Sequence, residues 1–179
     1  MAYIFASTSK ISFPGAGVAI IITGDENMKR IKAQMGAQTI GHDKLNQLRH
    51  VRYFGSVEGV LARMREHAAV LAPKFEAVLN TLERDLAPAG VATWTKPKGG
   101  YFISLNAMPG TAKRIYALMK GAGVTMTGAG ATYPYGKDPA DSNLRIAPSY
   151  PAPKELAMAA EILCVCVKLA ACEKLLGIQ

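Results

Sequence analysis

Two serines and a lysine follow a short apolar stretch at the start of the chain. Residues 3–6 (Tyr-Ile-Phe-Ala) predict a buried strand, and Ser7, Ser9 and Lys10 come directly after it. The next segment, Phe-Pro-Gly at 13–15, interrupts regular structure, so we expect the lysine on a turn beside small hydroxyl residues. Desolvation at such a site would favour the neutral amine, which is a nucleophile. The alternative is a solvated turn lysine, since most lysines are exposed.

An arginine near the end of the chain is the second candidate for chemistry. Residues 143–147 read Asn-Leu-Arg-Ile-Ala and predict a strand. Arg145 alternates with Leu144 and Ile146, so we expect it to face away from the core. Its planar guanidinium suits a carboxylate, to which it can donate two parallel hydrogen bonds. The alternative is an arginine exposed on a surface strand.

The composition is that of a globular protein with a real core. The chain has 179 residues, of which 50% are hydrophobic and 19% are charged. No apolar run approaches the roughly 20 residues that a membrane span needs. Met1 leads straight into the predicted strand, without the basic and apolar segments of a signal peptide. We therefore expect a cytoplasmic protein that does not enter a membrane.

Charge, cysteines and histidines narrow the function classes further. The net charge is +8, but the basic residues are scattered and only 7% of residues are aromatic, so we expect no nucleic-acid binding. The three cysteines fall in one predicted helix, and the three histidines are far apart in the sequence. Neither set has the spacing of a metal site, so we expect free thiols and no metal.

The first half predicts the elements that must position the lysine. One further buried strand and two helices are expected at residues 17–23, 27–38 and 42–51. Residues 56–86 then carry one apolar stripe at three- and four-residue steps, which predicts a long amphipathic helix. Pro73 should kink or split that helix. We place a domain boundary there, between residues 1–72 and 73–179.

The second half predicts a small α+β domain around the arginine. Four strands and two helices are expected at residues 91–95, 101–105, 124–127, 143–147, 111–122 and 154–176. Residues 128–142, rich in Gly, Tyr, Pro and Asp, are expected to form a loop. Trp94 and Phe102 are expected in the core.

One motif suggests an unrelated chemistry. Residues 7–10 (Ser-Thr-Ser-Lys) fit S-x-x-K, the nucleophile motif of penicillin-recognising enzymes. That motif needs its serine at a helix start and the partner elements S-D-N and K-T-G. Phe-Pro-Gly at 13–15 argues against the helix, and neither partner is present. We therefore set this possibility aside.

The chain resembles the class I/II (fold type I) pyridoxal-phosphate-dependent aminotransferases along its whole length. Residues 7–10 resemble the S-x-S-K segment at the cofactor lysine, and residues 96–102 (Lys-Pro-Lys-Gly-Gly-Tyr-Phe) resemble the P-x-G-G-x-F strand entry. Residues 143–147 resemble the strand whose arginine binds the substrate α-carboxylate. Residues 7–17 and 41–50 are most similar to a subgroup of aspartate aminotransferases.

The resemblance implies an α/β fold class, with this chain as the C-terminal part of a fold type I enzyme. It would comprise the end of the large α/β domain, residues 1–72 with the start of the linking helix, and the small α+β domain, residues 73–179. Because the resemblance covers only the C-terminal half of the family's chain, we expect a truncated reading frame or a fragment. The absent half would supply the acid on the pyridine nitrogen, the stacking aromatic and a glycine-rich phosphate turn.

The resemblance also implies a reaction and a set of site residues. Lys10 would form the internal aldimine with pyridoxal 5′-phosphate and carry the proton during transfer of an α-amino group to a 2-oxo acid. Ser7, Ser9 and the backbone N–H of Gly17, together with that of Gly15, would bind the cofactor phosphate. Arg145 would bind the α-carboxylate of the amino acid or the 2-oxo acid. The full-length form would be a homodimer.

One departure from the family and three alternatives remain open. The family often has a second phosphate-binding arginine eight residues after the lysine, where this chain has Val18. The alternatives are a non-catalytic remnant, a lyase or decarboxylase on the same fold, and the cofactor-binding domain of a transcriptional regulator. If sister strands are missing, the edges of the first two strands would be exposed, so we also expect a tendency to associate.

Overall fold

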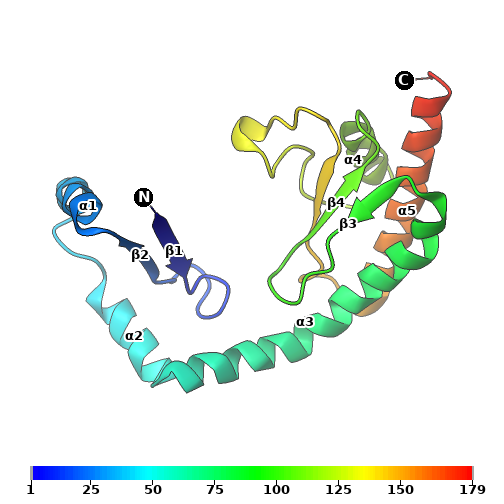
Figure 1. The fold of residues 1–179 in the computed structure, drawn as a ribbon. Coiled ribbons are helices and arrows are strands. Elements are labelled where there is room, and N and C mark those ends of the chain that lie inside the picture. The colour runs from blue at the N-terminus through cyan, green and yellow to red at the C-terminus, as the bar shows by residue number, and fades with distance from the viewer. Residues whose placement is uncertain (1, 179) are drawn as a thin grey trace. The chain divides into compact units, whose positions relative to one another are not determined.

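The computed structural model describes residues 2–178. The chain forms two compact units, Met1–His67 and Ala68–Gln179, and the division falls within one long helix, α3 (Val57–Asp85) (Figure 1). No helix in the described part of the chain is long and apolar enough to cross a membrane.

The first unit contains a two-stranded antiparallel sheet and two further helices. Strand β1 (Tyr3–Ser7) pairs with β2 (Ala19–Thr23), with Tyr3 opposite Thr23 and Ser7 opposite Ala19. Helices α1 (Asp25–Gln38) and α2 (Lys44–Phe54) follow. The expected strands and helices are confirmed here. The expected burial of the strands is wrong, because each strand has one sheet neighbour within residues 2–178 and all of β1 is exposed.

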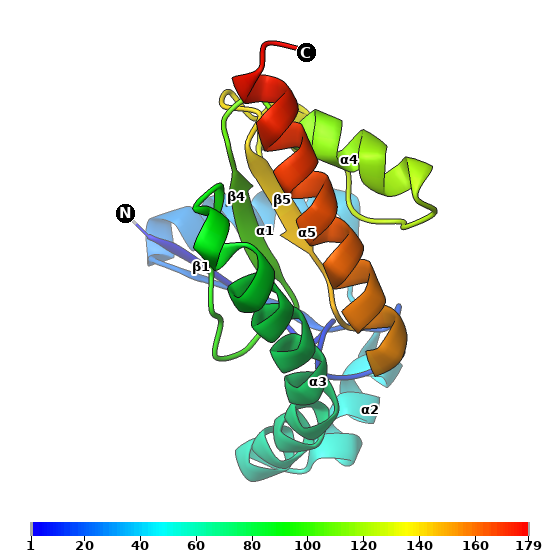
Figure 2. The same ribbon diagram turned by 90° about the vertical axis from the view of Figure 1, so that its right-hand side faces the viewer.

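The second unit is a three-stranded antiparallel sheet packed against helices. The sheet order is β3-β4-β5, from β3 (Ala92–Trp94), β4 (Ile103–Ala107) and β5 (Asn143–Ile146). Figure 2 shows the C-terminal part of α3 beside α5 (Pro153–Leu175). Helix α4 (Ala112–Gly121) lies beside the C-terminal half of α5. Short 3₁₀ turns, η1 (Ala87–Ala89) and η2 (Pro134–Gly136), complete the unit.

The core of this unit follows from alternation along the strands. Ile103 and Leu105 of β4 and Leu144 of β5 have exposed fractions of 0%, 0% and 1%. They pack with buried side chains of α3 and α5, including Leu82 and Val167. Burying such aliphatic side chains is the main favourable contribution to folding.

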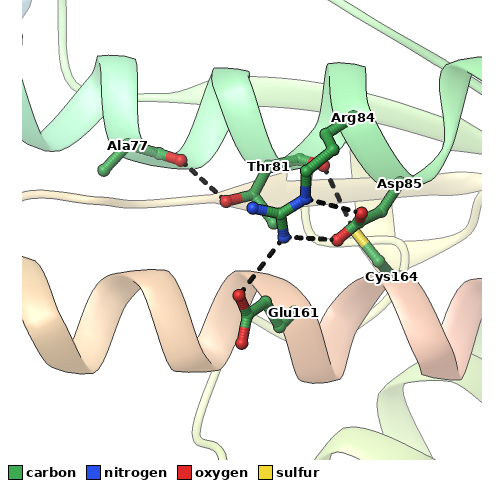
Figure 3. A network of polar contacts seen from close by, with 6 residues as sticks. All are labelled: Ala77, Thr81, Arg84, Asp85, Glu161 and Cys164. Carbon is green, nitrogen blue, oxygen red and sulfur yellow. Dashed lines mark hydrogen bonds and ion pairs between the residues drawn. The ribbon is translucent and has the colours of Figure 1, made fainter.

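Polar contacts join α3 to α5 at the edge of that core (Figure 3). Arg84 donates two hydrogen bonds to Asp85, at 2.8 and 2.7 Å, and a third to Glu161 at 3.2 Å. The hydrogen bonds from Arg84 lower the pKa of Asp85. Beside them the thiol of Cys164 lies 4.0 Å from the carbonyl oxygen of Thr81, and burial raises the pKa of Cys164 to about 11. Cys164 is therefore a packed, protonated thiol.

One expectation about the second half is wrong. Residues 124–127 form no strand; instead Val124 and Met126 pack against the core, which explains the apolar alternation that predicted one. Of the two outcomes expected at Pro73, a kink or a split, the split does not occur, because α3 runs from Val57 to Asp85. A proline removes one backbone hydrogen bond, and the buried side chains of Phe75 and Val78 hold the next turn in place.

Asp138 holds the loop that leads into β5. Its carboxylate accepts hydrogen bonds from the backbone N–H groups of Ala140, Ser142 and Asn143, at 2.9, 2.8 and 2.8 Å. These bonds, with that from Asn143 the largest contribution, lower the pKa of Asp138. The loop before β5 is thus organised by one carboxylate.

The exposed strands predict association of the isolated chain. Ile4 and Ile22 are cross-strand partners on one face of the sheet, with exposed fractions of 57% and 55%. Apolar strands with unpaired edges readily pair with other chains. Replacing both residues with Ser should reduce the associated fraction measured by size-exclusion chromatography with light scattering. Leu175→Ser, at an apolar site on α5 with an exposed fraction of 73%, should not. A stable, wholly monomeric parent chain would contradict this prediction.

Asp138→Asn should destabilise the chain at neutral pH but not in acid. A carboxylate whose pKa is lowered on folding stabilises the folded state above its ordinary pKa of about 4, and this contribution is lost as the pH falls through the folded-state value. Urea unfolding at pH 7 should therefore show a lower midpoint for Asp138→Asn than for the parent, and the difference should shrink at pH 3. Glu76→Gln removes an exposed charge on α3 and is the control. An unchanged difference at both pH values would contradict the assignment.

Candidate active site

The loop between β1 and β2 carries the candidate lysine, and Thr8 closes it. The backbone N–H of Thr8 donates to the carbonyl of Val18 at 2.9 Å, and the N–H of Val18 donates to Thr8 Oγ1 at 2.8 Å. The carbonyl of Thr8 also accepts the N–H groups of Ile11 and Ser12, both at 2.9 Å. One residue therefore joins the two ends of the loop and forms the tight turn inside it.

The structure places Lys10 on this turn, three residues after β1 ends. Its side chain is exposed, so the described residues do not supply the desolvation that its position after an apolar strand suggested. The turn position of Lys10 is confirmed, and its exposure in this chain agrees with the alternative of a solvated turn lysine.

Ser7, Ser9 and Gly17 are brought together beside Lys10. Ser7 Oγ lies 2.6 Å from Ser9 Oγ, and the N–H of Ser9 donates to Ser7 Oγ at 3.1 Å. A Cβ atom added to Gly17 would lie 2.7 Å from Ser9 Oγ and 3.3 Å from the Ser9 backbone. A side chain at position 17 would therefore displace the Ser9 hydroxyl and crowd the Ser9 backbone. Val18, where the family often has arginine, contributes its backbone to the closure.

Helix α2 packs one polar face against the same loop. Asn46 donates through Nδ2 to the carbonyl of Ala16 at 2.9 Å. His50, one turn later, has an exposed fraction of 7%, and its Nε2 lies 2.7 Å from Ser12 Oγ and 3.1 Å from Thr8 Oγ1. Sequence reasoning missed both residues. The four-residue spacing places them on one face of the helix, but nothing in the sequence indicated which segment that face contacts.

Aromatic rings complete the contact between the loop and α2. Phe13 of the loop meets His50 edge-on, with ring centroids 5.4 Å apart, and lies 5.0 Å from the ring of Tyr53. Tyr53 in turn meets Phe54 at 5.0 Å. The guanidinium carbon of Arg49 lies 5.7 Å from the centroid of Phe13. Edge-on packing of this kind contributes beyond simple burial of area.

Arg145 lies in the second unit, on β5 opposite Ser104 of β4. Its guanidinium carbon is 4.4 Å from the centroid of the Phe102 ring, within the range of a cation–π contact. Its Nε is buried and has no hydrogen-bond partner among the described residues. Phe102, expected in the core, is instead 41% exposed. Its ring lies against the guanidinium of Arg145.

A polar network fixes the strand that carries Arg145. Asn143 donates through Nδ2 to Ser104 Oγ at 2.8 Å and to Asn106 Oδ1 at 2.7 Å. Its Oδ1 accepts the hydroxyl of Thr132 at 2.6 Å. Asn143 is buried, so these bonds satisfy its whole amide and hold the start of β5 in register.

These residues fit the cofactor that the resemblance implies. Two serine hydroxyls in contact can share one hydrogen between them and donate the other to a phosphate oxygen. The missing Cβ of Gly17 leaves its backbone close to them. In the second unit, the guanidinium of Arg145 lies over Phe102 and its Nε has no partner among the described residues, and a guanidinium suits a carboxylate. Among residues 2–178 there is no group of three or more His, Cys, Asp or Glu side chains that could hold a metal ion.

Comparison with known proteins gives one consistent result. The aspartate amino-transferase family model matches residues 1–179. An aspartate aminotransferase of Corynebacterium glutamicum is 54% identical over 169 residues, which are 94% of this chain and 39% of that protein. The chain thus spans about two fifths of the length of this curated relative.

Solved structures agree with the sequence relatives. The crystal structure of an aspartate transaminase from C. glutamicum has a TM-score of 0.90 and 53% identity, covering 96% of this chain and 41% of that one. An α-aminoadipate aminotransferase of Thermus thermophilus, solved with N-(5′-phosphopyridoxyl)-L-leucine, has a TM-score of 0.72 and 22% identity, covering 95% and 42%; it supports the fold alone. The expected α/β fold class, part of a fold type I enzyme, is confirmed. By its match along the whole sequence, this chain belongs to the aspartate aminotransferase family.

Proposed function

We propose that this chain is the part of an aspartate-aminotransferase-type enzyme that binds pyridoxal phosphate and the substrate α-carboxylate. The observation that supports the proposal is the closed loop of residues 8–18, which carries Lys10 and in which the Ser9 hydroxyl contacts that of Ser7 and lies close to Gly17. The family match along residues 1–179 supports it. Aminotransferases as a class act on amino acids and 2-oxo acids.

Lys10, Ser7, Ser9 and Gly17 would hold the cofactor. When bound, pyridoxal phosphate supplies an aldehyde and a ring that accepts electrons from the α-carbon of the amino acid. Lys10 would supply the amine that holds that aldehyde, and the same amine would carry a proton from the α-carbon of the amino acid to the cofactor's aldehyde carbon. The serine hydroxyls and the N–H of Gly17 donate to phosphate oxygens.

Arg145 would bind the α-carboxylate of the amino acid and of the 2-oxo acid. A guanidinium can present two N–H groups to one carboxylate, and this fixes the orientation of the substrate as well as adding affinity. Phe102 limits the guanidinium to the region above its ring, so the arginine is held before any substrate arrives. Its pairing with Ser104 on β4 fixes the strand beneath it.

The complete enzyme would need residues beyond those described. The chain covers 39% of its C. glutamicum relative, so a non-catalytic remnant is the second candidate. A lyase or decarboxylase on the same fold is the alternative reaction class. We include in the proposal a boundary at Pro73 between a large-domain remainder (1–72) and a small domain (73–179). A homodimeric full-length form and a cytoplasmic location belong to the same proposal.

Trapping with borohydride tests the cofactor site directly. The chain is incubated with pyridoxal phosphate, reduced, digested and analysed by mass spectrometry. We expect the phosphopyridoxyl group mainly on Lys10, because the neighbouring hydroxyls hold the phosphate near that amine. Lys10→Arg should remove the dominant label, and Lys29→Arg, at an exposed ion-paired lysine, should not. Labelling spread evenly over the lysines, or none, would contradict the proposal and favour the remnant.

Replacing Arg145 tests the carboxylate site in an assembled enzyme. We would produce this chain together with the remaining part of the C. glutamicum relative and assay transfer from aspartate to 2-oxoglutarate. Arg145→Lys should lower kcat/KM by about 10- to 100-fold, because lysine cannot donate the paired hydrogen bonds.

A matched substitution separates this effect from lost charge or packing. Arg114→Lys alters an arginine of α4 that is ion-paired to Glu173 at 2.6 Å, and it should leave kcat/KM within about twofold of the parent. An Arg145→Lys enzyme with unchanged KM for both carboxylate substrates would contradict the assignment of Arg145.

A further inference from the structure

We propose that His50 is a positioning residue for the lysine loop, whose Nδ1 donates within helix α2 and whose Nε2 accepts hydrogen bonds from loop hydroxyls. Neither the family match nor the sequence motifs assign it a role. The relevance of His50 to catalysis rests on the proposed function, whereas its effect on the loop does not.

The hydrogen-bond partner of Nδ1 indicates which nitrogen carries the hydrogen. Nδ1 of His50 lies 2.8 Å from the carbonyl oxygen of Asn46, one turn earlier in α2. A carbonyl oxygen can only accept, so Nδ1 must donate. In the neutral ring Nε2 is then an acceptor, and it faces the loop.

The loop offers two hydroxyls to this one acceptor. Ser12 Oγ lies 2.7 Å from Nε2 and Thr8 Oγ1 lies 3.1 Å from it. Thr8 Oγ1 already accepts the N–H of Val18, so its own hydrogen is available to donate. Ser12 lies 3.1 Å from the carbonyl of Thr8 as well, so its hydrogen can be shared between that oxygen and the imidazole.

The positions of the two hydroxyls explain why this contact matters for Lys10. Thr8 and Ser12 lie on either side of Ser9 and Lys10 in the chain, so His50 contacts both ends of the turn that carries them. A catalytic amine depends on a supporting shell that holds its backbone in one place. The helix thus supplies a fixed point for a loop that follows an exposed strand.

Burial makes the contact hard to replace by water. His50 is the one buried residue of α2, and its ring packs against Phe13 at 5.4 Å and Phe54 at 6.1 Å. If the imidazole were replaced by an apolar ring of similar size, the packing would remain, but the hydroxyl of Thr8 would lose its acceptor and that of Ser12 would keep only the carbonyl of Thr8. Leaving a partly buried polar group unpaired destabilises the closed loop.

Two variants of the full 179-residue chain separate packing from hydrogen bonding. His50→Phe keeps an aromatic ring, while His50→Gln places an amide oxygen near the position of Nε2. His42→Phe, at an exposed histidine just before α2, is the control. Hydrogen exchange of backbone amides in residues 8–18 and the fraction of reduced pyridoxal phosphate on Lys10 are the two readouts. Amides of the second unit report whether the chain is folded.

We expect His50→Phe to speed exchange of the loop amides by about tenfold and to lower selective labelling of Lys10, with amides of the second unit unchanged. His50→Gln should recover most of both effects, and His42→Phe should change neither. In the parent chain, ¹⁵N NMR should find the imidazole hydrogen on Nδ1. If His50→Phe does not fold, the glutamine variant and this NMR measurement decide.

The proposal is overturned if the hydrogen of the neutral ring is on Nε2, or if His50→Phe leaves loop exchange as in the parent. It is also overturned if the phenylalanine and glutamine variants behave alike. The proposed function can fail separately: a parent chain without selective labelling at Lys10 would refute the cofactor site, while faster loop exchange in His50→Phe would still establish the role of His50 in the loop.

Discussion

Thr8 meets Val18 twice, once through its backbone N–H and once through its side-chain oxygen, and the geometry of the candidate cofactor site depends on this closure. The same threonine accepts the N–H groups that form the turn around Lys10. Glycine at position 17 suits this closure, because the closed loop brings its backbone close to Ser9. The positions of Lys10, the two serine hydroxyls and Gly17 therefore depend on one local hydrogen-bond pattern. They do not depend on a surrounding hydrophobic core.

Both candidate sites are held by short polar contacts to the backbone. In the first unit, Asn46 and His50 bind the loop from one face of α2. In the second, the Asp138 carboxylate accepts hydrogen bonds from backbone N–H groups just before and at the start of β5. The side chain of Asn143 holds the strand that carries Arg145. The two units differ in the hydrophobic core that supports these contacts. In the second unit, α3, α5 and the three-stranded sheet form a buried core. In the first unit, strand β1 of the two-stranded sheet is exposed.

The sequence predicted most elements because their signals are local: apolar alternation, helical periodicity and turn residues. It predicted the turn at Lys10 and the strand at Arg145 for the same reason. It misjudged the burial of β1, since an apolar run indicates that a strand needs covering but not whether the described residues cover it. Residues 124–127 show the converse, because packing against a core needs no strand partner. His50 could not be found because its partners are distant in the chain.

The central claim is that residues 7–18 of this chain form a binding site for pyridoxal phosphate. An NMR titration of the ¹⁵N-labelled chain with pyridoxal phosphate, and separately with inorganic phosphate, tests it most directly. We predict saturable shifts confined to the amides of the loop, with Ser9 and Gly17 responding to both compounds and Lys10 mainly to the aldehyde. Shifts scattered over surface lysines of both units, or no saturable shift in the loop, would contradict the claim.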